Sequence, residues 1–350
     1  MKILAPIKSH DELEMLVESG AEELYCGITP EEWNQEYSGA AWLSRRSPKG
    51  GGFESWAELR ATVTDAHRSG LHVFITLNAP FYTTTQMDSV VKIAHRLDDD
   101  IGADALIIAD PNLLLRMRQE KIRAALHVSS VAAALNSEAI RFLMDFGVKR
   151  VVLPRSVGLS EIETIVNAVR GEVEIETFIL NDGCAFEEGF CSTTHHHAVG
   201  AFCTGLSGMD TEFEGVAGQD LTYSQTVKLK CNLLDYWKYI WYLNGNGCST
   251  APNGLPYGPC GLCAIKDLMR IGVDSLKIVG RESGPFKKLA SVKMVADIVK
   301  KARAGADRLY LIERARSLRN TPEHCDAGFM CYYRGESAVP EEEALLEQTA

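Results

Sequence analysis

Short apolar runs recur along the chain, and most of them are followed by a stretch in which apolar residues have helical spacing. The eight runs cover residues 2–7, 22–28, 72–79, 105–109, 124–128, 150–153, 173–180 and 275–279. They are continuous rather than strictly alternating, which is typical of parallel strands buried on both faces. The pattern therefore predicts eight buried strands separated by helices.

The stretches between these runs predict the helices. Helical spacing covers residues 9–19, 55–69, 85–98, 137–146, 159–170, 264–271 and 286–304, and a short helix begins at Pro111. A glycine stands shortly before four of the predicted strands: Gly20, Gly102, Gly147 and Gly272. Helices commonly end at such a glycine. Eight strand–helix steps match a closed (β/α)8 TIM-like barrel. A doubly wound open α/β sheet is the alternative, because periodicity alone does not distinguish the two.

The alternation is interrupted once, after the seventh strand. Residues 181–263 show no regular pattern and predict an irregular, cysteine-rich insertion. We expect residues 1–304 to form the barrel with this insertion, and residues 305–335 to form a C-terminal extension. The acidic stretch 336–350 is rich in small residues and is predicted to be a disordered tail.

Composition and charge narrow the class of protein. Of the 350 residues, 46% are hydrophobic, which is enough for a sizeable core. The net charge of −11 does not favour a large contact with nucleic-acid phosphates, although it leaves room for a local basic patch. No run of about 18 apolar residues could span a membrane, and the first residues lack the apolar core of a signal peptide. We therefore expect a cytoplasmic protein without a membrane segment.

Ten cysteines are many for a reducing compartment, where clustered thiols more often bind a metal than form disulfides. Most lie in the insertion: Cys184, Cys191, Cys203, Cys231, Cys248, Cys260 and Cys263. Four thiolates suit either zinc or an iron–sulfur cluster, and the spacing leaves both open. Cys325 and Cys331 lie outside the barrel pattern. They form either part of a second site, together with Cys26, or a structural thiol pair.

Barrel enzymes carry their functional side chains at the carboxyl ends of the strands. Residues assigned to such positions here are Asn78, Asp110, His127, Ser129, Arg155, Glu176 and Arg281, and Arg46 follows the second strand in the loop 29–53. Arg155 and Arg281 are predicted to bind a carboxylate or phosphate of the substrate, with Asn78 and Arg46 beside them. The alternative for the arginines is an internal ion pair with Glu176 or Asp110.

Three of these residues are candidate catalytic groups. His127 is a candidate acid–base residue, with a satisfied structural histidine as the alternative. Glu176 and Asp110 are the carboxylates predicted to share the mouth with it.

Four motifs resemble those of the collagenase-like peptidase U-32 family. The segment 176–191 resembles the signature E-x-F-x-x-G-S-x-C-x4-G-x-C, and departs from it at Asn181, Asp182 and Gly183. Three further segments resemble family motifs in the same order: H-V-S-S at 127–130, K-R-V-V-L-P-R at 149–155 and G-V-D-S-L-K-I-V-G-R at 272–281. The resemblance runs from about residue 1 to residue 304.

The resemblance implies a barrel-like catalytic domain with a four-cysteine 4Fe-4S cluster. By their positions in the motifs, the implied ligands are Cys184, Cys191, Cys203 and Cys260, with Cys263 or Cys231 as the alternative fourth ligand. Zinc is the alternative metal if the resemblance does not extend to the cofactor.

The resemblance also implies a class of reaction. Members of the family hydroxylate transfer RNA, ribosomal RNA or quinone precursors without oxygen, and some use prephenate as the oxygen source. We therefore expect an oxygen-independent hydroxylase that takes a small anionic, prephenate-like substrate or one presented by a macromolecule. The alternatives are a peptidase, as the family name says, or the non-catalytic half of a heterodimer with a homologous partner chain. Neither a G-x-S-x-G nor an H-E-x-x-H motif supports the peptidase.

Overall fold

The computed structural model is a closed barrel of eight parallel strands that pair in chain order, with the first strand also paired to the eighth. The strands are β1 (Lys2–Pro6), β2 (Glu23–Gly27), β3 (His72–Leu77), β4 (Ala105–Ile108), β5 (Ala125–Val128), β6 (Arg150–Val152), β7 (Glu174–Leu180) and β8 (Ser275–Ile278). The closed barrel predicted from the apolar runs is confirmed, and the open sheet is excluded.

The structure describes residues 1–37, 41–46, 50–184, 188–191, 211–216, 220–247, 250–251, 253–328 and 330–333. The tail predicted for 336–350 lies outside the described residues, as do Cys203 and Cys248. Among the described helices, none is long and apolar enough to cross a membrane.

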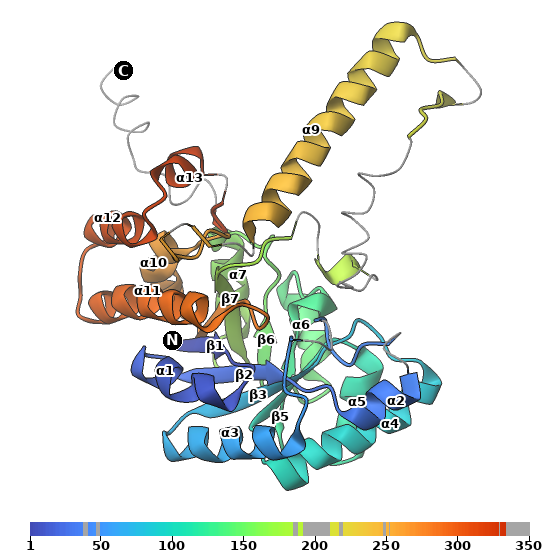
Figure 1. Cartoon of the computed structure of the whole chain (residues 1–350), viewed down its shortest axis with the longest axis vertical. Coiled ribbons are helices and arrows are strands. Elements are labelled where there is room, and N and C mark those ends of the chain that lie inside the picture. Colours follow the sequence, from blue (N-terminus) through green and yellow to red (C-terminus); the bar gives the residue numbers. More distant parts are fainter. Residues whose placement is uncertain are drawn as a thin grey trace.

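Helices cover the outside of the barrel (Figure 1). Those that match the sequence pattern are α1 (Leu13–Glu18), α3 (Trp56–Arg68), α4 (Thr84–His95), α5 (Pro111–Gln119), α6 (Ser137–Met144), α7 (Leu159–Val169), α10 (Ile265–Ile271) and α11 (Pro285–Arg303). Short helical turns precede or follow some of them: η1 (His10–Glu12), η2 (Arg96–Ile101), η3 (Ser130–Ala132), η4 (Glu188–Phe190) and η7 (Leu262–Ala264).

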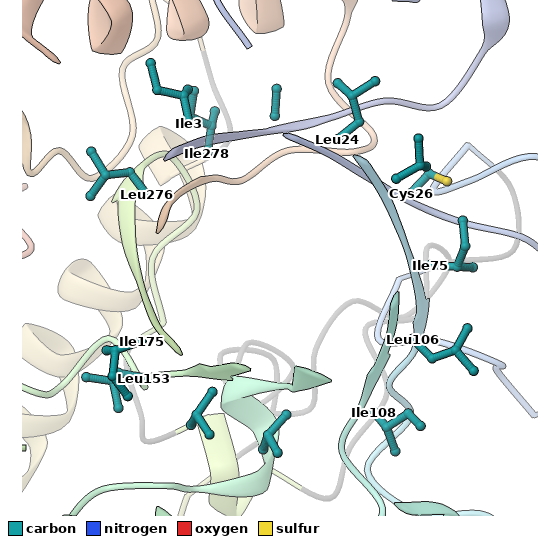
Figure 2. Packing of buried hydrophobic residues seen from close by; sticks show 14 of the residues in the cluster. Ile3, Leu24, Cys26, Ile75, Leu106, Ile108, Leu153, Ile175, Leu276 and Ile278 are labelled. Atoms are coloured by element: carbon teal, nitrogen blue, oxygen red, sulfur yellow. The ribbon is translucent and has the colours of Figure 1, made fainter. Parts of the chain in front are cut away.

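Alternate residues of each strand face the helices or the barrel interior. Figure 2 shows the outward set, with Leu24, Ile75 and Leu106 directed away from the centre of the barrel. A small apolar cluster fills part of the interior: Leu4, Tyr25, Phe74, Ala105 and Ile107. Charged side chains occupy much of the remaining interior. Both faces of the strands are therefore buried, but they are not both apolar.

The prediction that the insertion is irregular is wrong for one long segment. Helix α9 (Tyr223–Gly247) lies within it and projects away from the barrel (Figure 1). Its described side chains are mostly exposed, including Val227 and Leu234. Its less exposed residues, Leu229, Leu233, Tyr236 and Trp237, recur at helical spacing, so this stretch does carry the periodic signal of a helix that the sequence reading missed. A shorter helix, α2 (Glu31–Tyr37), was also missed, in the predicted loop 29–53.

The C-terminal extension returns to the barrel after α11. Helix α12 (Arg308–Arg319) is followed by α13 (Pro322–Ala327), and α12 packs against α11. The chain then pairs with the end of the insertion, where Cys331 forms a parallel bridge with Cys260. The extension therefore lies beside the carboxyl ends of β7 and β8.

Candidate functional site

A cavity of about 90 Å³ opens at the carboxyl ends of the strands. Its polar lining residues come from at least six strand–loop connections: Arg45, Arg46, Thr76, Asn78, Ser129, Ser130, Arg155, Asp182, Glu188, Lys277 and Arg281. Cys184 also lines it. We call this cavity the mouth cavity. The prediction that Arg155 and Arg281 face one cavity at this end of the barrel is confirmed.

Arg281 follows β8 and is almost fully buried, at 5% exposure. Its guanidinium donates to the hydroxyl of Thr76, at 2.5 Å, and to that of Ser44, at 3.4 Å. Burial lowers the pKa of Arg281, and the neighbouring Arg46 lowers it further. A Cβ atom on Gly27 would come within 2.5 Å of this guanidinium, so the glycine at the end of β2 makes room for it.

Two acidic side chains hold the other arginines at the mouth. Arg155 Nε donates to the carbonyl oxygen of Asp182, at 2.9 Å, and its guanidinium pairs with Glu188. The same guanidinium lies 3.8 Å from the ring centre of Phe178. Arg46 pairs with the Asp182 carboxylate, which also lies 3.7 Å from the Arg155 guanidinium. The two arginines therefore share one counter-ion on the exit turn of β7.

That exit turn explains a departure from the family signature. Asn181 and Asp182 have φ angles of 67° and 55°, in the left-handed region that glycine adopts without strain. Asn and Asp are the residues other than glycine that tolerate this region best. The Asn181 amide donates to Ser291 Oγ, at 3.0 Å, which holds the turn from inside. The substitution keeps the turn and adds a carboxylate to the mouth cavity.

Asn78 lies at the end of β3 in the mouth cavity, as predicted. The side-chain oxygen Oδ1 of Asn78 accepts from the main-chain N–H of Arg45, at 3.1 Å. The side-chain NH2 group donates to Ser129 Oγ, also at 3.1 Å. The side chain thereby connects the loop after β2 to the end of β5.

Glu176 lies inside the barrel and not at its mouth, so the prediction that places it at a strand end is wrong. It is the third residue of β7 and is fully buried. It accepts from Lys277 Nζ, at 2.7 Å, and from Arg150, at 3.2 Å. Lys277 in turn lies on the floor of the mouth cavity, 4.2 Å from the ring centre of Tyr25. Burial lowers the pKa of Lys277, and Glu176 offsets part of that effect.

Arg150 connects this pair to the amino-terminal half of the barrel. Its guanidinium donates to both oxygens of Glu23, at 2.7 and 2.8 Å, and also contacts Glu174. Burial alone would lower the pKa of Arg150, but the Glu23 hydrogen bonds and the Glu176 charge hold it above its ordinary value. The barrel interior therefore contains a continuous ion-pair network: Glu23, Arg150, Glu176 and Lys277.

The prediction that His127 lies at the mouth of the barrel is also wrong. It lines a second cavity, of about 880 Å³, at the amino-terminal ends of the strands. The ring is 4% exposed and packs edge-on against Phe74, and its Nδ1 has no hydrogen-bond partner among the described residues. Burial lowers the pKa of His127 well below its ordinary value, and the charges of Arg150 and Lys277 lower it further.

This burial predicts a pH effect on stability. The unfolded chain protonates His127 near pH 6.5, whereas the folded chain keeps it neutral, so stability falls as the pH drops below about 6.5. We expect His127→Gln to lose about 1.4 kcal/mol less stability than the wild type between pH 7.5 and 5.5. Urea denaturation of both proteins at the two pH values measures the difference. Equal losses would show that folding does not change the proton affinity of His127.

Asp110 caps a helix and does not line the mouth cavity. One carboxylate oxygen accepts from the main-chain N–H of Asn112, at 2.8 Å, and the other accepts from that of Tyr82, also at 2.8 Å. Since both oxygens serve the start of α5 and the loop after β3, the position indicates a structural residue. The prediction that Asp110 lies at the mouth of the barrel is therefore wrong.

The predicted cluster ligands do not form one group in the described structure. Cys184 lines the mouth cavity and Cys191 follows η4, while Cys203 is outside the described residues. Cys260 and the alternative Cys263 line a different cavity, beside the C-terminal extension. Cys231, the other alternative, is exposed on α9. Among the described residues, no three candidate ligands are placed to hold one metal ion, and the four-cysteine set stays a prediction because Cys203 is not among them.

Sequence reasoning missed several residues of the mouth cavity. Lys277 is the clearest, since a lysine between Leu276 and Ile278 in an apolar run must be buried and needs a partner. Asp182 and Glu188 were also missed. They lie in the insertion, where no periodic pattern indicates which way a side chain points.

The fold and the cavity define a class: a (β/α)8 barrel protein whose mouth is lined by an excess of basic side chains. The model for peptidase family U32 matches residues 8–205 and 247–339. The chain belongs to this family, as its motifs predicted.

Three curated proteins are similar to the chain. It is 29% identical over 133 residues to tRNA hydroxylation protein P of Escherichia coli strain K12, covering 38% of this chain and 29% of that protein. It is 24% identical over 306 residues to tRNA hydroxylation protein P1 of Bacillus subtilis strain 168, covering 85% and 61%. It is 32% identical over 144 residues to the E. coli 23S rRNA 5-hydroxycytidine C2501 synthase, covering 40% and 20%. In each case the chain spans less than two thirds of the relative.

Proposed function

We propose that this chain is an oxygen-independent hydroxylase that binds a small anionic substrate, or the anionic part of a larger one, in the mouth cavity. The observation that carries anion binding is the charge of the lining. Among the described lining residues, the cations Arg45, Arg46, Arg155, Lys277 and Arg281 outnumber the acids Asp182 and Glu188. A cavity with such an excess attracts an anion.

Arg281 is the main candidate anchor. Its guanidinium is buried against two hydroxyl groups that carry no charge, Thr76 and Ser44. An arginine that is taken out of water costs several kcal/mol unless a counter-charge compensates it. A substrate carboxylate supplies that charge, and the planar guanidinium can bind both carboxylate oxygens at once.

The other basic groups suit a second anionic group and a proton transfer. Arg46 and Arg155 are held at the rim by Asp182, so both guanidinium groups are already ordered where a second carboxylate would bind. Lys277 lies below them with its pKa lowered by burial, which makes it a better proton donor near neutral pH. A dicarboxylate such as prephenate therefore matches the charges around the cavity.

The names of the relatives supply the reaction class. They describe hydroxylation of tRNA and synthesis of 5-hydroxycytidine in rRNA. Hydroxylation without oxygen also needs a redox-active group, for which the cysteines of this chain are the candidate ligands. The net charge of −11 favours a small substrate or one presented locally over a large RNA contact.

A peptidase finds less support in the same cavity. Ser129 lies at the mouth, but its Oγ accepts from the Asn78 amide. His127, two residues earlier, lies in the other cavity at the opposite end of the barrel. The serine therefore has no histidine base from its own strand, which nucleophilic hydrolysis would need.

The proposal is tested by mass spectrometry of RNA nucleosides and small metabolites from cells with and without the gene, grown without oxygen. We expect a hydroxylated species that disappears on deletion and returns with the wild-type chain. Arg281→Lys should fail to restore it. Arg68→Lys, at an arginine that is exposed on α3, should restore it as the matched control. If no hydroxylated species depends on the gene, the hydroxylase proposal is wrong.

A further inference from the structure

The cavity that contains His127 lies at the end of the barrel opposite the mouth cavity. Its volume is about 880 Å³, against about 90 Å³ for the mouth cavity. We call it the amino-terminal cavity. Cavities that bind small molecules commonly have volumes of about 300–1,000 Å³. Barrel enzymes carry their chemistry at the carboxyl ends of the strands, so this cavity lies outside the site described above.

The floor of the amino-terminal cavity combines an imidazole with apolar groups. His127 is 4% exposed, and its Nδ1 has no hydrogen-bond partner in the described part of the chain. The ring of Phe74 lies edge-on to it, with 4.7 Å between the ring centres, and Ala125 is a further lining residue. Buried polar atoms in folded proteins nearly always have a hydrogen-bond partner. An imidazole without one, on the wall of a cavity, suits a polar group of a ligand.

The floor suits an uncharged part of that ligand. Arg150 also lines the cavity, but its guanidinium already donates to Glu23 and Glu174. The charges there are balanced within the interior ion-pair network, and burial keeps the imidazole neutral. A charged ligand group would therefore lose its hydration at the floor without gaining an opposite charge.

The rim of the cavity, by contrast, carries exposed charges of both signs. Lys2 and Lys149 line it and form no ion pair with the described residues. Glu172 lines it too, and no cation in the described ranges pairs with its carboxylate. These three side chains come from three segments of the chain, at the starts of β1, β6 and β7.

Two further acids at the rim are already engaged. Asp104 pairs with His67 and His72, at 2.8 Å in each case. Asp274 accepts from the main-chain N–H of Ile175, also at 2.8 Å. The rim therefore offers cations and one carboxylate to a ligand, above a neutral floor.

We propose that the amino-terminal cavity is a second ligand site, which binds a small zwitterion of the α-amino acid class. Its carboxylate pairs with Lys2 or Lys149, its ammonium group pairs with Glu172, and its side chain extends towards Phe74 and His127. A simple anion would meet the carboxylate at the rim, and a simple cation would meet the lysines. A zwitterion complements both signs.

The two cavities can be occupied independently. The interior network of Glu23, Arg150, Glu176 and Lys277 fills the barrel between them, with Glu23 and Arg150 lining one cavity and Lys277 lining the other. Binding of an amino acid therefore does not rest on the proposed hydroxylase function.

Titration calorimetry of the whole chain, purified without oxygen, tests the site with the common L-α-amino acids as probes. We expect at least one to bind with a Kd at or below about 1 mM. Its decarboxylated amine and its N-acetyl form should each bind at least about 10-fold more weakly, because each lacks one of the two charges. If no amino acid binds, or if either analogue binds as tightly as the parent, the site is not one for a zwitterion.

Variants locate the contacts. His127→Phe keeps the size and shape of the ring but cannot hydrogen-bond, and it should weaken binding by about 10-fold. Lys149→Met should also weaken it, whereas Lys228→Met, at an exposed lysine on α9, should not. Unchanged affinity in folded His127→Phe and Lys149→Met would overturn the proposal.

Hydrogen exchange of the wild type needs no variant, so a variant that fails to fold does not weaken the test. The bound amino acid should slow exchange in residues 125–128 and 171–175, which border the amino-terminal cavity. Slowed exchange in residues 44–46 and 181–184 instead would place the amino acid in the mouth cavity and contradict the second site. Neither result bears on anion binding by Arg281, which is measured separately.

Discussion

Replacing Arg281 with lysine is expected to weaken dicarboxylate binding by about 10- to 150-fold while the fold and the metal content survive. The charge is retained, but a guanidinium offers two parallel donors to a carboxylate and an ammonium offers a point charge. Losing one charge-assisted hydrogen bond costs about 1.5–3 kcal/mol. Titration calorimetry with prephenate and simpler dicarboxylates measures the change, with Arg68→Lys as the control at an exposed position.

The result also decides the role of this arginine. Equal affinities in Arg281→Lys and wild type would mean that the guanidinium serves Thr76 and Ser44 and not a ligand. A loss of metal in the variant would mean that Arg281 supports the insertion, and anion binding would then rest on Arg155. A salt dependence of binding in the wild type, absent with neutral diamides, would support the basic cavity as the site.

Replacing Arg150 with methionine is expected to destabilise the folded protein by about 3–5 kcal/mol at neutral pH. The side chain is 4% exposed and is the shared partner of Glu23 and Glu176, which are themselves buried. Its removal leaves two carboxylates in the barrel interior, and among the described residues only Lys277 then pairs with Glu176. Chemical denaturation measures the loss, and it should shrink towards acid pH, because a protonated carboxyl needs no counter-charge.

The control for this experiment is Arg68→Met. Arg68 pairs with Asp65 on the surface of α3, where its side chain is 76% exposed, and such pairs contribute about 0–1 kcal/mol. A loss of similar size in both variants would show that the interior network is compensated by water or by other groups. That outcome would also weaken the view that Glu176 fixes the position of Lys277 at the cavity floor.

The barrel could be predicted because its signal is local. A strand buried on both faces is a short apolar run, and a glycine that stops a helix, such as Gly102 or Gly272, marks where the next run begins. Helix α9 carries such a signal too, because Leu229, Leu233 and Trp237 recur at helical spacing, but it was overlooked within the cysteine-rich insertion. The family followed from motifs at fixed spacing, and the match over residues 8–205 and 247–339 confirms it.

The sequence did not predict how far along the barrel axis each inward side chain lies. In the closed barrel Glu176 and His127 face inward, because strand residues two apart share a face. Whether an inward residue reaches the mouth depends on the stagger between neighbouring strands, which is a property of the closed barrel. For this reason Arg155 and Arg281, which follow their strands, were placed correctly, whereas Glu176 and His127 were not.

The sequence by itself therefore determined the alternation of eight strands with helices, the family and the presence of thiols and basic residues, whereas closure of the barrel was decided by the structure. Only the tertiary structure decided which of them meet. Cys260, which lies 12 residues before Gly272, lines a cavity together with Cys325 and Cys331. The physical reason is that hydrogen bonds between Cys260 and residues 330–332 close a loop of about 70 residues, and no local pattern specifies such a contact.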